Sequence, residues 1–253
     1  MDAIAMAQPE LPTSVSQRRL VPEVMDDPEL DPVLHEAALR GLGRINRISR
    51  SAAMLWPAIE KAAARTPGRE LRVLDLACGG GDVLIQLAQS AARKKIQVEF
   101  SGADVSPVAL EFAAAQAEKA RVGINWLQID VFEESLPDSF DLCMNSLFMH
   151  HLTAEQAVAV FGKMKAASST VLINDLRRGP VAHAITVAGT RLLSRSPVVH
   201  VDGPRSVRAA WTPKELLALA HAAGLEDAKV QHRFPWRMLM EWTASEPGDG
   251  GVS

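Results

Sequence analysis

The sequence predicts an α/β fold in which a doubly wound, mostly parallel sheet is covered by helices on both faces. Between residues 71 and 176, short runs rich in Val, Ile and Leu alternate with segments of helical apolar spacing. This alternation is typical of βαβ units and of strands buried on both faces. The 253 residues suffice for one core of this kind and are few for two full domains.

Composition excludes several other classes of protein. Hydrophobic residues make up 47% and charged residues 23%, as in ordinary globular proteins. The net charge of −3 gives no basic field for a nucleic-acid partner. There is no apolar run of about 20 residues and no secretory signal pattern, and Cys78 and Cys143 indicate a reducing compartment. We expect a cytoplasmic protein without stable membrane insertion, and its oligomeric state stays open.

The chain before the alternating region divides into two parts. Residues 1–28 are rich in Pro, Asp, Glu and Ser without a period, and we expect a mobile N-terminal arm. Apolar residues then recur at steps of three and four from Leu34 to Ile48, which predicts N-terminal helices within residues 29–66. We therefore expect a single domain over residues 29–253.

The alternating region predicts five strands and the three helices between them. The predicted strands are residues 71–77, 97–104, 124–130, 140–147 and 169–176. The predicted helices are residues 82–94, 107–122 and 153–167. Together they form a core over residues 71–175.

A cluster of small residues marks the first strand-to-helix junction, where residues 73–83 read VLDLACGGGDV. Ligands bind at such junctions, and small residues let the backbone turn sharply and approach a ligand closely. The dinucleotide pattern G-x-G-x-x-G fails here, because its third position is Leu84. The carboxylate of Asp75 disfavours a pyrophosphate but can accept hydrogen bonds from an ammonium group. The junction therefore predicts a ligand that is cationic at this end.

The junction resembles the first motif of class I S-adenosylmethionine-dependent methyltransferases, which reads acid-x-Gly-x-Gly-x-Gly. Here the motif comprises Asp75, Ala77, Gly79 and Gly81, with Ala77 in place of the first glycine. The resemblance implies a Rossmann-like methyltransferase fold with a seven-stranded sheet. It also implies S-adenosyl-L-methionine as cofactor.

Three later motifs of this family follow in the same order. By the resemblance, Asp104 accepts hydrogen bonds from the ribose hydroxyls and Val105 lies against the adenine. Asp130 receives the adenine amino group, and Val131 packs on the ring. The fourth motif places two polar side chains toward cofactor and acceptor, and a basic residue of the preceding helical segment lies near the cofactor carboxylate in many relatives. The two polar side chains are Asn145 and Ser146. The helical segment contains Arg44, Asn46, Arg47 and Arg50, and Arg50 is the candidate for the cofactor carboxylate.

Each acid also has a structural interpretation. Asp is favoured in turns and helix caps, and Asp104 precedes Ser106 and Pro107, which predict a helix start. Three acids at the ends of three successive strands favour the cofactor site.

The segment LFMHHL is similar to the small-molecule branch of the family, which includes the ubiquinone- and menaquinone-biosynthesis enzymes and natural-product relatives. His150 and His151 follow the fourth strand, where the methyl acceptor is expected. An imidazole can take the proton of a phenol as its oxygen attacks the methyl group. The pair can equally shape the turn, since methyl transfer to an acidic phenol needs little beyond alignment. Of the two, His151 is the preferred candidate base.

Residues 178–211 interrupt the alternation where this family builds a lid over the acceptor. An apolar helical stretch at 181–193 and a mixed loop are expected there, and residues 212–243 then supply a capped helix and further strands. The apolar lid indicates an aromatic or apolar acceptor. Candidate residues to meet that acceptor are His183, Arg191, His200, Arg205 and Arg208.

These patterns predict a methyltransferase acting on an oxygen of a small phenolic, polyketide or lipid-like molecule. Residues 26–52, 201–216 and 234–237 are also similar to methyltransferases of secondary metabolism encoded beside type III polyketide synthases. The alternative is a non-catalytic module that keeps the fold for sensing or scaffolding. A nucleic-acid or protein methyltransferase is disfavoured, because NSLFMHHL replaces the Asn/Asp-Pro-Pro-aromatic signature. No metal is expected, since no His, Cys and carboxylate cluster has ligand spacing.

Overall fold

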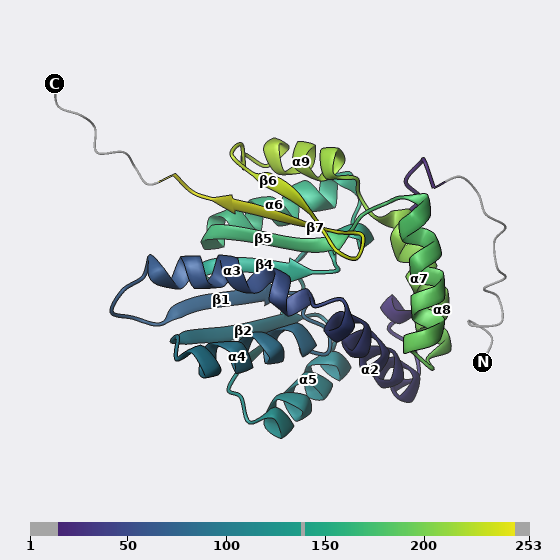
Figure 1. Cartoon of the computed structure of the whole chain (residues 1–253), viewed down its shortest axis with the longest axis horizontal. Helices are drawn as coiled ribbons and strands as arrows, with labels where there is room; N and C mark the ends of the chain where they lie inside the picture. Colours follow the sequence, from purple (N-terminus) through teal and green to yellow (C-terminus); the bar gives the residue numbers. More distant parts are fainter. Residues whose placement is uncertain (1–14, 138–139, 246–253) are drawn as a thin grey trace.

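The predicted doubly wound sheet is confirmed. A computed structural model of the protein describes residues 15–137 and 140–245, and these form one seven-stranded sheet of order β3-β2-β1-β4-β5-β7-β6 (Figure 1). Strands β1 to β5 pair in parallel, whereas β7 runs antiparallel to both β5 and β6. The strands are β1 Leu71–Leu76, β2 Val98–Asp104, β3 Asn125–Gln128, β4 Phe140–Ser146, β5 Ser168–Leu176, β6 Lys229–Arg233 and β7 Arg237–Thr243.

The strand order reverses beside β1, because β2 lies on one side of it and β4 on the other. Asp75 of β1 lies opposite Gly102 of β2 and Met144 of β4. In open α/β sheets, ligands bind beyond the carboxyl ends of the strands at such a reversal. The loops that follow β1, β2 and β4 therefore meet at one edge of the sheet.

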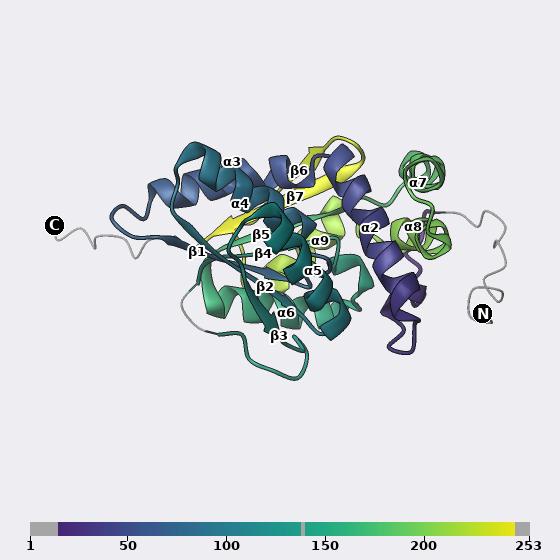
Figure 2. The same ribbon diagram turned by 90° about the horizontal axis from the view of Figure 1, so that it is seen from below.

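Helices cover both faces of the sheet, and each face has its own apolar core. One core joins α3 and α4 to the strands, and the other joins α6 and α9 to the opposite strand faces. Figure 2 shows α3 and α4 on one side of the strands and α6 on the other. Alternate residues of each central strand feed the two cores, so these strands read as continuous apolar runs. The helices are α3 Ser51–Ala64, α4 Asp82–Lys94, α5 Pro107–Ala120, α6 Ala154–Ala167 and α9 Pro213–Ala222.

Three of these helices begin at side chains that cap them. Ser106 accepts a hydrogen bond from the backbone N–H of Ala109, and Pro107 occupies the first turn of α5. Thr212 and Glu215 form the predicted capping box of α9, and Thr153 forms another at the start of α6. Such caps satisfy backbone donors that the first helical turn leaves unpaired.

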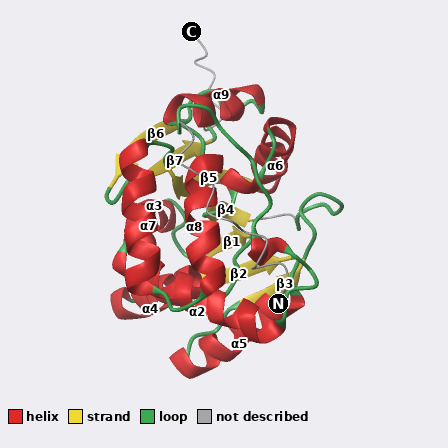
Figure 3. Ribbon diagram, turned by 90° about the vertical axis from the view of Figure 1, so that its right-hand side faces the viewer, coloured by secondary structure: helices red, strands yellow, loops and turns green. Residues whose placement is uncertain are grey.

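A further helical layer lies across the carboxyl ends of the strands. It consists of α2 (Pro32–Ile48), α7 (Pro180–Leu193) and α8 (Pro197–Ala209), and Figure 3 looks onto it with the strand ends behind. The helical insertion is therefore present, but the mixed loop predicted after residue 193 is wrong, because α8 occupies most of it. Gly203 and Pro204 suggest a loop in the sequence, yet burial of apolar residues of α8 against α2 stabilises a helix there. A side chain at Gly203 would lie 2.5 Å from Thr190 of α7, so this glycine lets the two helices approach.

The segment of residues 15–28, which we call the strap, packs against α8 instead of lying free of the domain. Val24, in a short 3-10 helix at Val24–Asp26, is 8% exposed and belongs to the core between α2 and α8. Arg18 stacks 3.5 Å from the ring of Trp211 and donates to backbone oxygens, that of His150 among them. The mobile arm predicted for residues 1–28 is thus not observed over 15–28, because buried apolar and charged contacts hold this part. Residues 1–14 of that prediction lie outside the described residues.

Within the described part of the chain, no helix is both long enough and apolar enough to cross a membrane.

Candidate functional site

The loop between β1 and α4 has the backbone conformation that its small residues allow. Ala77, Gly79 and Gly81 have φ angles of 52°, 52° and 68°, in the left-handed region that favours glycine. At Gly81, an added Cβ would also lie 2.6 Å from the ring of Trp126. Ala77 shows that a single methyl group is accommodated where the family motif has glycine. The loop therefore presents backbone close to the ligand side of the sheet.

Asp104 at the end of β2 fastens this loop. Its Oδ2 accepts a hydrogen bond from the Gly79 N–H at 2.8 Å, and its Oδ1 accepts one from the Ser106 N–H at 2.9 Å. Burial raises the pKa of Asp104, and the two backbone donors act in the opposite direction. Each carboxylate oxygen still has acceptor capacity for a ligand.

Asp75 is a buried carboxyl that lacks a complete set of partners. It is 2% exposed, and its Oδ1 has no hydrogen-bond partner among residues 15–137 and 140–245. Burial, together with the nearby carboxylates of Asp82 and Asp104, raises the pKa of Asp75 well above its ordinary value. Burying several acids together is costly unless a cation compensates them. The arrangement therefore suits a ligand that brings a positive charge.

The three predicted adenine-side residues lie toward the β3 edge of the sheet. Val105 follows β2 and is 59% exposed, so its apolar surface is available for contact. Asp130 follows β3, and its Oδ1 accepts a hydrogen bond from the Phe132 N–H at 2.8 Å. Val131 is half-buried and packs on the core beside α6. These residues and Asp104 border the same loop cluster after β2 and β3.

At the end of β4, Asn145 and Ser146 differ in their surroundings. Asn145 is fully buried, and both polar atoms of its side chain lack a partner in the described structure. Ser146 accepts a hydrogen bond from Asn174 at 2.7 Å. An amide with no partner at a strand end is a candidate to bind a ligand, because leaving it unpaired costs about 1–3 kcal/mol.

His150 is buried between two carboxylates. Its Nδ1 lies 2.7 Å from Asp175 Oδ1, and its backbone N–H donates to Asp175 Oδ2 at 3.0 Å. Its Nε2 lies 3.7 Å from Glu23 Oε1 of the strap. Burial lowers the pKa of His150, but Asp175 and Glu23 outweigh burial and raise it to about 10. In this environment the ring is the protonated, positively charged imidazolium at neutral pH.

His151 is the more accessible member of the pair, with 21% of its side chain exposed. Its Nδ1 lies 2.8 Å from Asp26 Oδ2, and its ring is 4.3 Å from that of His150, centroid to centroid. A 3-10 turn at Met149–His151 places both rings beyond β4. The strap therefore supplies carboxylates to both histidines, which no local sequence pattern indicated.

Arg237 is a buried basic residue that the sequence analysis did not single out. It is 2% exposed and donates through Nη2 to Asn46 Oδ1 at 3.2 Å and Ser49 Oγ at 3.1 Å, while its Nη1 has no partner in the described residues. Asn46 in turn donates to Asp82 at 3.3 Å, beside the Gly-rich loop. Arg50 is exposed and forms the left-handed turn between α2 and α3. The only signal for Arg237 in the sequence is a charge at the start of an apolar strand.

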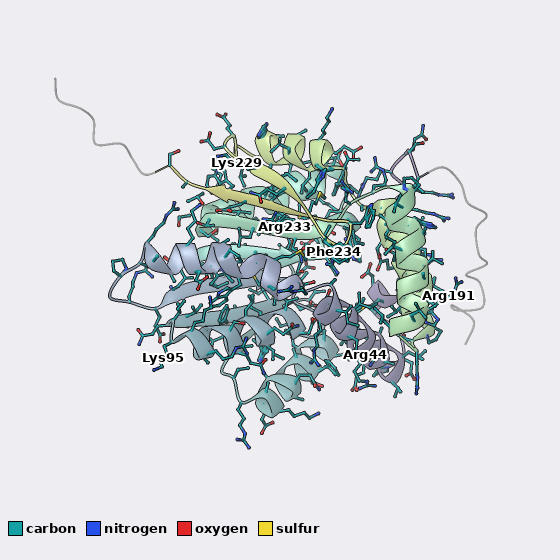
Figure 4. The ribbon with its side chains drawn as sticks, viewed as in Figure 1. Arg44, Lys95, Arg191, Lys229, Arg233 and Phe234 are labelled. Carbon is teal, nitrogen blue, oxygen red and sulfur yellow. The ribbon has the colours of Figure 1, made fainter. Side chains whose placement is uncertain are left out.

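The lid candidates do not form one group. His200 Nε2 lies 2.8 Å from the Ser194 carbonyl oxygen, and Arg205 donates to the Pro22 carbonyl oxygen at 3.1 Å. Both residues therefore have structural partners within the lid and strap. Arg191 is exposed at the outer end of α7 (Figure 4). His183 and Arg208 are both half-buried. Burial lowers the pKa of His183, and the positive charge of Arg208 lowers it further.

Comparisons with known proteins give consistent matches. A family model described as a methyltransferase domain matches residues 73–169. The chain is 27% identical over 171 residues to a ubiquinone biosynthesis O-methyltransferase of Nitrosococcus oceani, covering 64% of this chain and 70% of that protein. It is 28% identical to the same enzyme of Dinoroseobacter shibae, covering 71% of this chain and 70% of that protein.

Solved structures share the fold. A putative O-methyltransferase from Nostoc punctiforme aligns with a TM-score of 0.61 and 19% identity over 90% of this chain. The methyltransferase SibL in its apo form aligns with a TM-score of 0.61 and 18% identity over 87% of this chain. The chain spans 64% and 60% of the lengths of those two proteins.

Proposed function

The chain is a class I S-adenosylmethionine-dependent methyltransferase similar to the ubiquinone-biosynthesis enzymes, and we propose that it methylates an oxygen of a small phenolic, polyketide or lipid-like molecule. The observation that carries the proposal is the position of the histidine pair beyond β4, beside the carboxylate-lined loop of β1 and β2. The O-methyltransferase names of the relatives support oxygen as the acceptor atom.

The residues around the loop fit S-adenosyl-L-methionine. When bound, the cofactor supplies a sulfonium-activated methyl group. We assign the amino group of its methionyl part to the unpaired Oδ1 of Asp75, because a buried carboxyl group there needs a cation. Ala77, Gly79 and Gly81 keep the backbone open to the ligand, and Asp104 is assigned to the ribose hydroxyls. Val105, Asp130 and Val131 are assigned to the adenine, and Asn145 and Ser146 to the end near the transferred methyl group.

For the carboxylate of the methionyl part, we propose Arg237 in place of Arg50. The free Nη1 of Arg237 is a buried donor with no partner in the described chain, and Asn46 links the same guanidinium to Asp82 beside the loop. Arginine is well suited to hold a carboxylate through two parallel hydrogen bonds. Arg50 is exposed, and its contribution to the backbone turn explains its position.

The two histidines take different roles in this proposal. His150 keeps its proton between Asp175 and Glu23 and acts as a positioning residue for the turn. His151 is accessible, and its Nδ1 faces Asp26, which leaves Nε2 to accept the proton of the acceptor hydroxyl. A base at this place makes the oxygen more nucleophilic as it attacks the methyl group in line.

The apolar character of the lid supports an aromatic or apolar acceptor. Helices α7 and α8 and the strap lie at the same edge of the sheet as the histidine pair. Both cysteines, Cys78 and Cys143, are free thiols, which supports a cytoplasmic location in a reducing environment.

The test begins with calorimetric titration of S-adenosylhomocysteine into the full chain. Methyl-labelled cofactor is then offered with simple catechols and alkylresorcinols, and with amines of similar size as controls. Transfer to a phenolic oxygen, located by mass spectrometry, is the expected result. Binding of the cofactor product with label only on amine nitrogen would contradict oxygen as the acceptor, and no binding would contradict the cofactor site.

A further inference from the structure

We propose that Glu23, His150 and His151 bind a divalent transition-metal ion of the zinc class. One ligand atom from each residue lies within 4.8 Å of the other two. The sequence predicted no metal, since no cluster showed ligand spacing. The fold overturns the basis of that prediction, because the strap carries Glu23 back onto the histidine pair from a distant part of the chain.

The orientation of both imidazole rings suits metal binding. The Nδ1 atom of His150 lies 2.7 Å from Asp175, and that of His151 lies 2.8 Å from Asp26. A carboxylate that accepts from Nδ1–H fixes the tautomer and leaves the Nε2 lone pair for an ion, and most metal-binding histidines are held in this way. Two adjacent rings with this support, both turned toward one carboxylate, form a prepared ligand set.

The distances between the ligand atoms are longer than in a metal-bound site, so the side chains must close around an ion. Glu23 Oε1 lies 3.7 Å from His150 Nε2, and Glu23 Oε2 lies 3.9 Å from His151 Nε2. Tetrahedral ligands at about 2.0–2.1 Å from zinc are roughly 3.4 Å apart. The three ligand atoms, which now lie within 4.8 Å of one another, must therefore draw together around an ion, and rotation of the side chains supplies this movement.

The third ligand is itself held in place. Glu23 accepts a hydrogen bond from Ser206 Oγ at 2.5 Å. The following residues of the strap, Val24 and Met25, donate their backbone N–H groups to the carboxylate of Asp202 at 2.9 and 3.0 Å. Contacts with α8 therefore position Glu23 before an ion arrives.

Charge also favours a dication at this place. An ion that binds His150 must displace the proton that this ring carries at neutral pH. The carboxylates of Glu23, Asp26 and Asp175 then surround the ligand atoms without a compensating charge, and the Glu23 side chain is only 10% exposed. Two imidazoles and one carboxylate match the ligand preference of zinc and similar ions. An open depression of about 330 Å³ is lined in part by Pro22, Glu23 and Asp26, so one ligand of the proposed site borders solvent-accessible space.

The role of the ion rests on the proposed function, whereas its binding does not. Three protein ligands leave a fourth position open, as in catalytic zinc sites. A hydroxyl of the acceptor in that position would lose its proton more readily because the ion stabilises the oxyanion. When the ion is bound, His151 would act as a metal ligand and no longer as the base. The ion would then activate the acceptor oxygen in place of the imidazole.

The test uses Zn²⁺ alone, titrated by calorimetry into the full chain after removal of metals with a chelator. We expect one ion per chain in the wild type and binding at least 10-fold weaker in Glu23→Gln, which keeps the shape of the side chain. Asp26→Asn, at a largely exposed side chain, is expected to weaken binding about 10- to 100-fold through His151. The matched controls are Glu29→Gln, exposed directly after the strap, and His221→Ala, exposed on α9; both should bind as the wild type does.

Co²⁺ provides an independent readout, because visible absorption of a four-coordinate site with histidine ligands should appear in the wild type and be lost in His151→Ala. Equal Zn²⁺ affinity in the wild type, Glu23→Gln and Asp26→Asn would overturn the proposal, as would absence of one-to-one binding. The titration contains neither methyl donor nor acceptor. Zn²⁺ binding without S-adenosylhomocysteine binding would therefore refute the proposed function alone, and the reverse result would refute the metal site alone.

Discussion

Replacing Asp104 by Ala tests the cofactor site at its most constrained carboxylate. The side chain already accepts the Gly79 and Ser106 N–H groups at 2.8 and 2.9 Å, one on each oxygen, and a carboxylate has acceptor capacity beyond these two bonds. Loss of a single hydrogen bond between a ribose hydroxyl and a charged carboxylate costs about 1.5–3 kcal/mol. This energy corresponds to S-adenosylhomocysteine binding about 10- to 150-fold weaker.

The assay is calorimetric titration of both proteins with S-adenosylhomocysteine, after circular dichroism has shown that the variant is folded. Glu99→Gln is the matched control, because it removes another carboxylate of β2 at the opposite end of the strand. Its affinity should equal that of the wild type. A folded Asp104→Ala protein that binds within threefold of the wild type would refute the assignment of Asp104 to the ribose.

Three further predictions concern the loop, the histidine pair and an ion pair. Gly81→Ala should lower the free energy of unfolding by about 1–3 kcal/mol in thermal or urea melts, because the added Cβ would lie 2.6 Å from Trp126 and φ is 68°. Gly123 has open space around it, so Gly123→Ala should change the free energy of unfolding little. His151→Ala should slow turnover of a phenolic acceptor and leave S-adenosylhomocysteine affinity unchanged; normal turnover would assign the ring to packing alone. The hydrogen bond from Arg69 lowers the pKa of Asp141, so Asp141→Ala should cost about 1–2 kcal/mol at pH 7. A lowered carboxyl pKa stabilises the fold fully only above the ordinary value near 3.9. The difference in free energy of unfolding between the wild type and Asp141→Ala should therefore shrink in urea melts as the pH falls below 4. A difference that stays constant would exclude the ionised carboxylate as its cause.

Local patterns were sufficient for the core of the sheet. Apolar runs and helical spacing identify β1 to β5 and the helices between them, because strands buried on both faces and amphipathic helices leave distinct periodicities. The acids at the ends of β1 and β2 were found for the same reason, since Asp75 and Asp104 directly terminate recognisable strands.

Helix α8 shows where local patterns mislead. Its Gly203 and Pro204 are typical of a loop, but Gly203 leaves room for Thr190 of α7. Burial of Val198, Val199 and Val207 outweighs the poor helical propensity. The strap was expected to be mobile for a similar reason. Its composition is polar, yet Val24 and Glu23 each find a buried partner surface on α8.

The sequence by itself determined the fold class, the Gly-rich turn and the order of the acids along the chain, because each depends on residues close together in sequence. Only the tertiary structure decided which groups share a site. Arg237 reaches Asn46, and Glu23 reaches His150, through packing between elements that are far apart in the chain. Such contacts leave no spacing to read, since their geometry is set by how the helical layer and the strap fold over the carboxyl ends of the strands.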